Sequence, residues 1–163
     1  MAIDPIRPTD DDARALAQSL LAQARFAALA VVLEDGRPQV TRIALGLAPD
    51  GAPLALISDL AAHSRALRSD PRASLLVGEP GPKGDPLTHP RLTIEARAAF
   101  VSPGSPDRPA LMQAWLAQHP KAAVYAGLAD FRFVRFAVLA GFLNGGFGKA
   151  FRLGPEDLDL PQV

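Results

Sequence analysis

Short apolar runs separated by tight turns recur along this chain, and they constrain its fold more than any other feature. Asp35-Gly36 and Asp50-Gly51 lie between such runs, and an Asp-Gly pair is a strong hairpin signal. Strands joined by turns of a few residues pair in antiparallel order. The pattern predicts strands at residues 26–33, 38–47, 53–57, 73–77, 91–101 and 131–141. We therefore expect a mostly β protein, a closed or partly open barrel with peripheral helices.

Helices are predicted around these strands. Thr9 is expected to cap a helix that runs to about Arg25, with acidic residues in its first turn. A second helix is expected to start at 105–107, where proline suits the first helical position, and a short one is expected at 121–128. A glycine-rich bend is predicted at 142–151, and the acidic tail from Gly154 is expected to be loosely held.

The composition fits a single domain over residues 1–163, with the barrel at about 26–152. Hydrophobic residues make up 48% of the chain and charged residues 21%, as in globular proteins. The formal net charge is zero, so no broad nucleic-acid surface is expected. The absence of cysteine excludes disulfides and thiolate metal sites. No apolar run reaches about 18 residues and no signal-peptide pattern opens the chain, so we expect a cytoplasmic protein without a membrane span.

Polar side chains gather where the third predicted strand ends and a short helix begins. Ser58 ends the strand, and His63, Ser64 and Arg65 open the helix. Free N–H groups and the helix dipole favour an anion at such a junction, and arginine binds phosphate through two donors. An ordinary strand-helix connection with solvated arginines explains the same residues, and composition alone favours that alternative. If the strand that carries Arg42 is a neighbour, Arg42, Ser58, Ser64 and Arg65 can converge on one phosphate.

Two other patterns give weaker signals. The bend at Gly145–Lys149 lacks the spacing of a phosphate-binding P-loop or of a dinucleotide-binding loop, so it is best interpreted as a barrel corner, although Lys149 could meet an anion. The histidines at 63, 89 and 119 have no partner at metal-ligand spacing. The sequence therefore predicts no metal site.

An ordered set of motifs resembles the pyridoxamine 5′-phosphate oxidase-like, FMN-binding split-barrel superfamily. The resemblance covers residues 28–151 and is nearest to the haem-utilisation-type branch. The chain ends at Val163 without the additional C-terminal domain of that branch and without a histidine after His119, so haem ligation from such a domain is not expected. The motifs are Thr41–Leu45, Leu56–Leu60, His63–Leu67, Asp70–Leu76, Gly84–Leu87, Pro90–Thr93, Asp130–Arg132 and Gly145–Ala150.

The resemblance implies a six-stranded antiparallel Greek-key split barrel that forms a homodimer, with one FMN in each cleft between the subunits. By position, the phosphate is expected at Arg42, Ser58, Ser64 and Arg65. Backbone at Thr41, Ile43, Ile57 and Asp59 is expected to line the flavin ring, and Gly146 and Lys149 to close the site.

The implied function is that of a small FMN-dependent oxidoreductase with an undefined small-molecule substrate. The flavin supplies the chemistry, so no catalytic side chain is assigned. Two alternatives remain open. One is a non-catalytic module that binds flavin or a partner protein, and the other is a haem-binding or haem-degrading protein.

Overall fold

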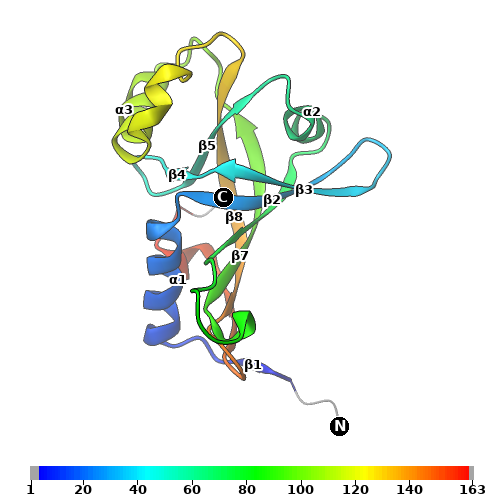
Figure 1. Ribbon diagram of the computed structural model, residues 1–163, viewed down its shortest axis with the longest axis vertical. Coiled ribbons are helices and arrows are strands. Elements are labelled where there is room, and N and C mark those ends of the chain that lie inside the picture. The colour runs from blue at the N-terminus through cyan, green and yellow to red at the C-terminus, as the bar shows by residue number, and fades with distance from the viewer. Residues whose placement is uncertain (1–3, 162–163) are drawn as a thin grey trace.

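The computed structural model describes residues 4–161, and within them the chain is mostly β. Nine strands form one sheet in this part of the chain, with three α-helices and three short 3-10 helices (Figure 1). The strands are β1 (Ile6–Arg7), β2 (Phe26–Val32), β3 (Pro38–Ala44), β4 (Gly46–Leu47), β5 (Pro53–Ser58), β6 (Arg72–Val77), β7 (Arg91–Phe100), β8 (Phe131–Asn144) and β9 (Ala150–Leu153). The helices are α1 (Asp11–Gln23), α2 (Ala62–Ser69) and α3 (Arg108–Gln118), with 3-10 turns at Pro86–Thr88, Pro120–Val124 and Pro155–Leu158.

The strand order confirms the predicted class, a β-dominated split barrel with flanking helices. The main path runs β1-β9-β8-β7-β6-β2-β3, and β5 pairs with the other edge of β8. Every pairing is antiparallel except that of β1 with β9. The six predicted strands are the six long ones, and β4 continues β3 after a short break. The sheet is split where β3 and β5 separate, because on the side of β5 away from β8 only the two residues of β4 pair with it.

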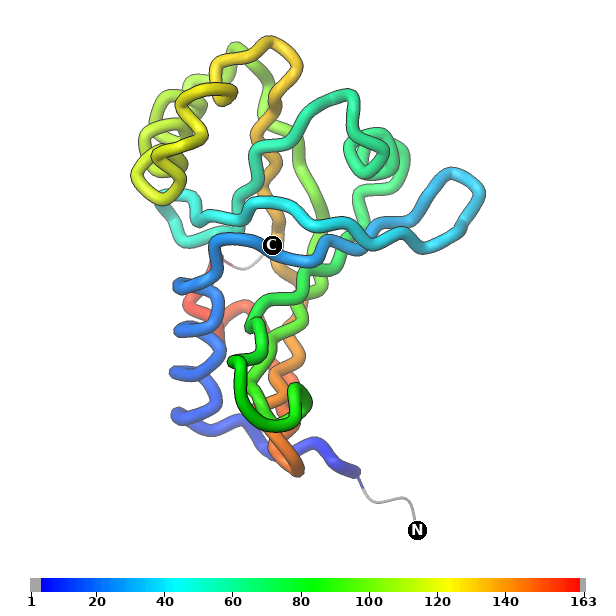
Figure 2. Tube along the Cα trace, viewed as in Figure 1, coloured from blue at the N-terminus to red at the C-terminus, as the bar shows by residue number. Residues whose placement is uncertain are grey.

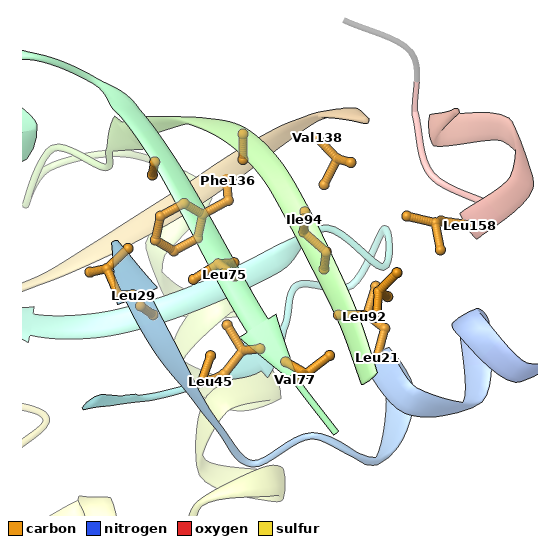
Figure 3. Packing of buried hydrophobic residues seen from close by; sticks show 14 of the residues in the cluster. Leu21, Leu29, Leu45, Leu75, Val77, Leu92, Ile94, Phe136, Val138 and Leu158 are labelled. Carbon is orange, nitrogen blue, oxygen red and sulfur yellow. The ribbon is translucent and has the colours of Figure 1, made fainter. Parts of the chain in front are cut away.

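Two apolar clusters hold the fold together. The larger one fills the inside of the curved sheet, where Leu29, Leu75 and Ile94 are fully buried (Figure 3). Helix α1 covers part of this cluster with Ala13, Ala17 and Leu21. The smaller cluster lies between β5, β8 and α3 and is centred on Trp115. Because the residues of β5 alternate between the two clusters, this strand is buried on both faces.

The predicted start of the first helix is wrong by one residue. Asp10, not Thr9, is the N-cap, because its carboxylate accepts the Ala13 N–H at 2.8 Å. The Thr9 hydroxyl instead donates to the carbonyl of Arg152 at 2.6 Å. This bond ties the start of α1 to β9. No helix among residues 4–161 has the length and apolar character needed to cross a membrane.

The predicted bend at 142–151 and the loosely held tail are also wrong. Strand β8 continues to Asn144 and β9 returns beside it, so the bend contains only 145–149. The tail packs on the inner cluster through Leu158, and Asp157 accepts from the Arg14 guanidinium at 2.7 Å and from the Gly154 N–H at 2.9 Å. The Gly154 N–H, and then Arg14, lower the pKa of Asp157. The last tail residues, 162–163, lie outside the described residues.

Candidate functional site

Helix α2 occupies the split between β3 and β5 and replaces the missing backbone pairing there. On one side, His63 Nδ1 lies 3.1 Å from the Thr41 hydroxyl of β3. On the other side, the Ser64 hydroxyl donates to the Ser58 carbonyl at the end of β5, at 2.6 Å. Ser64 has no solvent-exposed surface. The helix therefore joins the two strands through adjacent residues, and the predicted pair of hydroxyl residues lies together.

Both hydroxyl protons of this pair have protein acceptors. Ser58 Oγ donates to the Asp130 carboxylate at 2.6 Å and accepts the Leu60 N–H at 3.1 Å. The Asp130 carbonyl accepts the Asp59 N–H at 2.7 Å. The turn after β5 is therefore fixed by the residue that precedes β8. Neither hydroxyl is free to donate to a ligand in this arrangement.

Arg42 lies on the opposite face of β3 from Thr41. Its guanidinium carbon is 5.3 Å from the centre of the Phe26 ring, a cation–π contact on the outward face of the sheet. Gly46 pairs with Leu54 across β4 and β5, and continuing that register brings Arg42 opposite Ser58 on the far side of the split. Arg42 forms no ion pair with the residues at 4–161, so its charge is available to an anionic ligand.

Arg65 does not join the two hydroxyls. It is exposed on α2 and borders a hollow of about 370 Å³ against the turn between β2 and β3, where Glu34 and Asp35 lie. Within the described part of the chain it also forms no ion pair. Among residues 4–161 neither arginine is hydrogen-bonded to the two hydroxyls, and convergence of all four residues on one phosphate stays a prediction.

The residues whose backbone is predicted to line a flavin ring use their side chains within the protein, which leaves the backbone prediction in place. Ile43 and Ile57 are each 5% exposed, and their side chains belong to the inner cluster, so only their backbone can face a ligand. The Asp59 carboxylate holds two guanidiniums, that of Arg68 at 2.5 Å and that of Arg132 at 3.1 Å. This ion-pair group fixes the outer end of β5 rather than leaving a free carboxylate.

Gly146 and Lys149 lie at the other end of the molecule. Ser58 pairs with Phe131, the first residue of β8, whereas the bend follows Asn144, its last residue (Figure 2). A strand of 14 residues separates the two positions by on the order of 40 Å. One chain therefore cannot close the bend over a ligand held at Ser58, and the predicted closing role requires a second copy.

The outward face of the sheet is apolar and uncovered. Strand pairing aligns Arg42, Ala28, Leu76, Thr93 and Phe142 in one row across β3, β2, β6, β7 and β8. The large apolar residues on this outward face are exposed by 37% to 66%: Phe26, Val40, Leu76, Leu139 and Phe142. Leu139 is aimed outward by a bulge, because Ala140 pairs with Glu95 and Val138 with Ala96.

Comparison with known families settles the assignment. The model of the family described as pyridoxamine 5′-phosphate oxidase matches residues 13–144. The chain belongs to this family. The resemblance in the sequence motifs is thereby confirmed, and the family match spans both β3–β5, which form the split, and the central sheet.

Two of the proteins similar to this chain are haem proteins by name. A non-canonical heme oxygenase of Arabidopsis thaliana, HOZ, described as chloroplastic, is 34% identical over 119 residues, 72% of this chain and 35% of its own length. A heme binding protein of Mycobacterium smegmatis is 29% identical with a TM-score of 0.81, over 94% of this chain and 61% of that one. Protein Atu2129 of Agrobacterium tumefaciens, of unknown function, is 32% identical with a TM-score of 0.79, over 96% and 65%. The chain thus spans about a third of the curated relative.

Proposed function

We propose that this protein binds haem at the α2-bridged split, in a cleft completed by a second copy of the chain. The observation that carries the proposal is the state of the predicted phosphate cradle. Ser58 and Ser64 donate to protein acceptors, while Arg42 and Arg65 remain without acidic partners in the described part of the chain. Two separate cations suit a ligand with two separate carboxylates better than they suit a single phosphate.

The residues at the split fit haem in two further respects. The imidazole of His63 is half-buried there, and Phe26 offers an apolar ring beside Arg42. When bound, haem would supply oxygen or electron chemistry at its iron, while the chain holds and orients it. The names of the Arabidopsis and Mycobacterium relatives agree with this proposal.

FMN-dependent oxidoreduction is the second candidate. It is favoured by the register that brings Arg42 opposite Ser58, since a guanidinium and a hydroxyl on two sides of a gap are a common phosphate pair. The carboxylate of Asp130 argues against it, because it lies 2.6 Å from the Ser58 hydroxyl and repels a phosphate there. Ser58 would have to exchange partners before it could bind one. A flavin would supply hydride chemistry, and its substrate remains undefined.

The proposed second copy docks on the outward face of the sheet. A soluble monomer seldom leaves a continuous apolar patch of this kind uncovered. The same face carries a cation and an acid, Arg97 and Glu95, that form no ion pair among residues 4–161, so a copy related by two-fold symmetry offers them partners. The location of this protein in the cytoplasm is likewise a prediction.

The test is parallel titration of the purified protein with hemin and with FMN, followed by absorbance. We expect hemin to bind with a shifted Soret band and one equivalent per chain, and FMN to bind weakly or not at all. Arg42→Ala is expected to weaken hemin binding about 10-fold or more, since it removes a charge-assisted contact. Arg108→Ala is the matched control, because Arg108 lies on α3, off the outward face of the sheet, with its guanidinium 5.8 Å from the centre of the Phe133 ring. FMN binding without hemin binding would replace this proposal with the second candidate.

A further inference from the structure

We infer that His63 is the side chain that binds the iron of the haem, an inference that rests on the proposed function. The imidazole extends from the first turn of α2 at the split, and one of its two nitrogens is already held by the protein. Nδ1 lies 3.1 Å from the Thr41 hydroxyl, and no hydrogen-bond partner of Nε2 is found among residues 4–161. A histidine that binds a metal usually has its other nitrogen hydrogen-bonded in this way, which fixes the orientation of the ring.

The protonation state of His63 also suits a metal ligand. Burial lowers the pKa of His63, so the imidazole is neutral at physiological pH. Neutral imidazole is the form that binds a metal. A hydrogen bond in which Nδ1–H donates to the Thr41 oxygen leaves the lone pair on Nε2, the atom available to iron.

The other two histidines use their rings differently. His89 Nδ1 accepts the Gly81 N–H at 3.2 Å, so Nε2 carries the proton and donates to the Lys83 carbonyl at 2.8 Å. His119 Nε2 lies 2.8 Å from the Leu45 carbonyl, and its ring stacks on Trp115 at 4.3 Å. His63 is therefore the histidine with a fixed ring and a free nitrogen at the split.

The two free cations flank this imidazole along the chain. Arg42 follows Thr41 on β3, and Arg65 follows His63 by two residues on α2. Arg42 points to the opposite face of β3 from Thr41, so within one chain Arg65 is the cation that shares an element with His63. No group of three His, Cys, Asp or Glu side chains with metal-site geometry occurs in the described part of the chain, so a bare metal ion is not the proposed ligand. Haem needs fewer protein ligands because the macrocycle supplies the equatorial ones.

Tyrosine is the competing ligand type. Tyr125 packs on Phe131, the β8 residue that pairs with Ser58, and its ring centre is 5.0 Å from the Phe131 ring. A tyrosine can hold haem iron, so Tyr125 is near enough to the split to require its own variant. The Tyr125 ring packs against the apolar residues of the smaller cluster rather than at the split. This position favours His63 as the iron ligand.

The experiment compares hemin-loaded unsubstituted protein with His63→Ala, His89→Ala and Tyr125→Phe. Resonance Raman of the ferrous form reports the iron–imidazole vibration, and circular dichroism reports folding. We expect His63→Ala to lose this vibration and to bind hemin about 10-fold or more weakly. Added imidazole should restore the vibration in His63→Ala, while His89→Ala and Tyr125→Phe should match the unsubstituted protein.

The outcomes separate this inference from the proposed function. An unsubstituted protein that binds no hemin overturns both. Hemin binding with an unchanged iron–imidazole vibration in His63→Ala overturns the inference alone and leaves the proposed function in place. If Tyr125→Phe loses the iron ligand and His63→Ala keeps it, the ligand is Tyr125 and the inference about His63 is overturned. Thr41→Val is expected to keep the iron–imidazole bond but shift its vibration, because the hydrogen bond at Nδ1 is removed.

Discussion

The two faces of the central sheet carry similar apolar residues but differ in how far these residues are buried. On the inside, Leu29, Leu75 and Ile94 are fully buried under α1 and the opposite wall of the barrel. On the outside, Val40 and Leu76 are exposed by 66% and 44%, although the same strands carry them. Apolar side chains on both faces are typical of a sheet that is covered on both sides. The difference supports our proposal that a second copy supplies the outer layer.

The largest expected effect comes from a pair of neighbouring leucines that point to opposite faces. Leu75→Ala is expected to lower the free energy of unfolding by about 2–5 kcal/mol, because it leaves a cavity in the inner cluster. Leu76→Ala is the matched control and is expected to cost less than about 1 kcal/mol at protein concentrations where the chain is monomeric. Urea denaturation measures both. If the two variants lose equal free energy of unfolding at such concentrations, the two faces contribute equally to stability despite their different burial.

The outward face should control self-association rather than folding. Leu139→Glu is expected to weaken dimerisation by 100-fold or more, on the order of 3 kcal/mol, because a two-fold interface receives the charge from both copies. Light scattering over a concentration series measures the change. Leu60→Glu, at a residue 77% exposed beyond the end of β5, is the control and should leave association unchanged. A protein that is monomeric before any substitution contradicts the proposed second copy.

The bridge across the split should contribute a moderate part of the stability. Ser64→Ala removes the fully buried hydroxyl that donates to the Ser58 carbonyl. We expect a loss of about 1 kcal/mol in the free energy of unfolding, since one buried hydrogen bond is removed while the Ser58 carbonyl keeps the Ala61 N–H at 3.1 Å. Hydrogen exchange at α2 is expected to rise more than exchange at β7. Uniform loss of protection over both elements would argue against α2 as a separate bridge.

The smallest expected effect is on pH dependence. Burial lowers the pKa of His63 below its ordinary value of 6.5, so the folded state disfavours the protonated ring. The stability associated with His63 is therefore complete above about pH 6.5 and declines as the pH falls below that value towards the lower pKa of the folded state. Urea midpoints at pH 7.5 and 5.5 measure this decline. His63→Gln is expected to reduce it, and an identical pH dependence in that variant would assign the decline to other groups.

The fold could be predicted from the sequence because its signals are local. Turn pairs such as Asp35-Gly36 and apolar runs specify strands and hairpins, and all six long strands are found. The errors occur where a distant segment decides the outcome. The Thr9 hydroxyl donates to the Arg152 carbonyl of β9. The guanidinium of Arg14 on α1 donates to Asp157 and so holds the tail. No pattern within a few residues reports such contacts.

The site was predicted only in part for the same reason. Ser58 and Ser64 were placed together correctly, since they flank one turn. The partner of Ser58, Asp130, is 72 residues away and arrives because β5 pairs with β8, a register that the sequence does not specify. The outward direction of Arg42, by contrast, was readable from strand alternation, because Ile43 and Thr41 take the inner face. Phe26 was missed as its stacking partner because that contact depends on the pairing of β2 with β3.

We propose that haem binds at the split that α2 bridges, between two copies of the chain. Anomalous diffraction at the iron absorption edge, from crystals grown with hemin, locates the metal without any assumption about its ligands. We expect one iron per chain beside α2, with the outward sheet face of a second copy over it. Iron at the β8–β9 bend of an isolated chain, or a flavin at the split instead of iron, would contradict it.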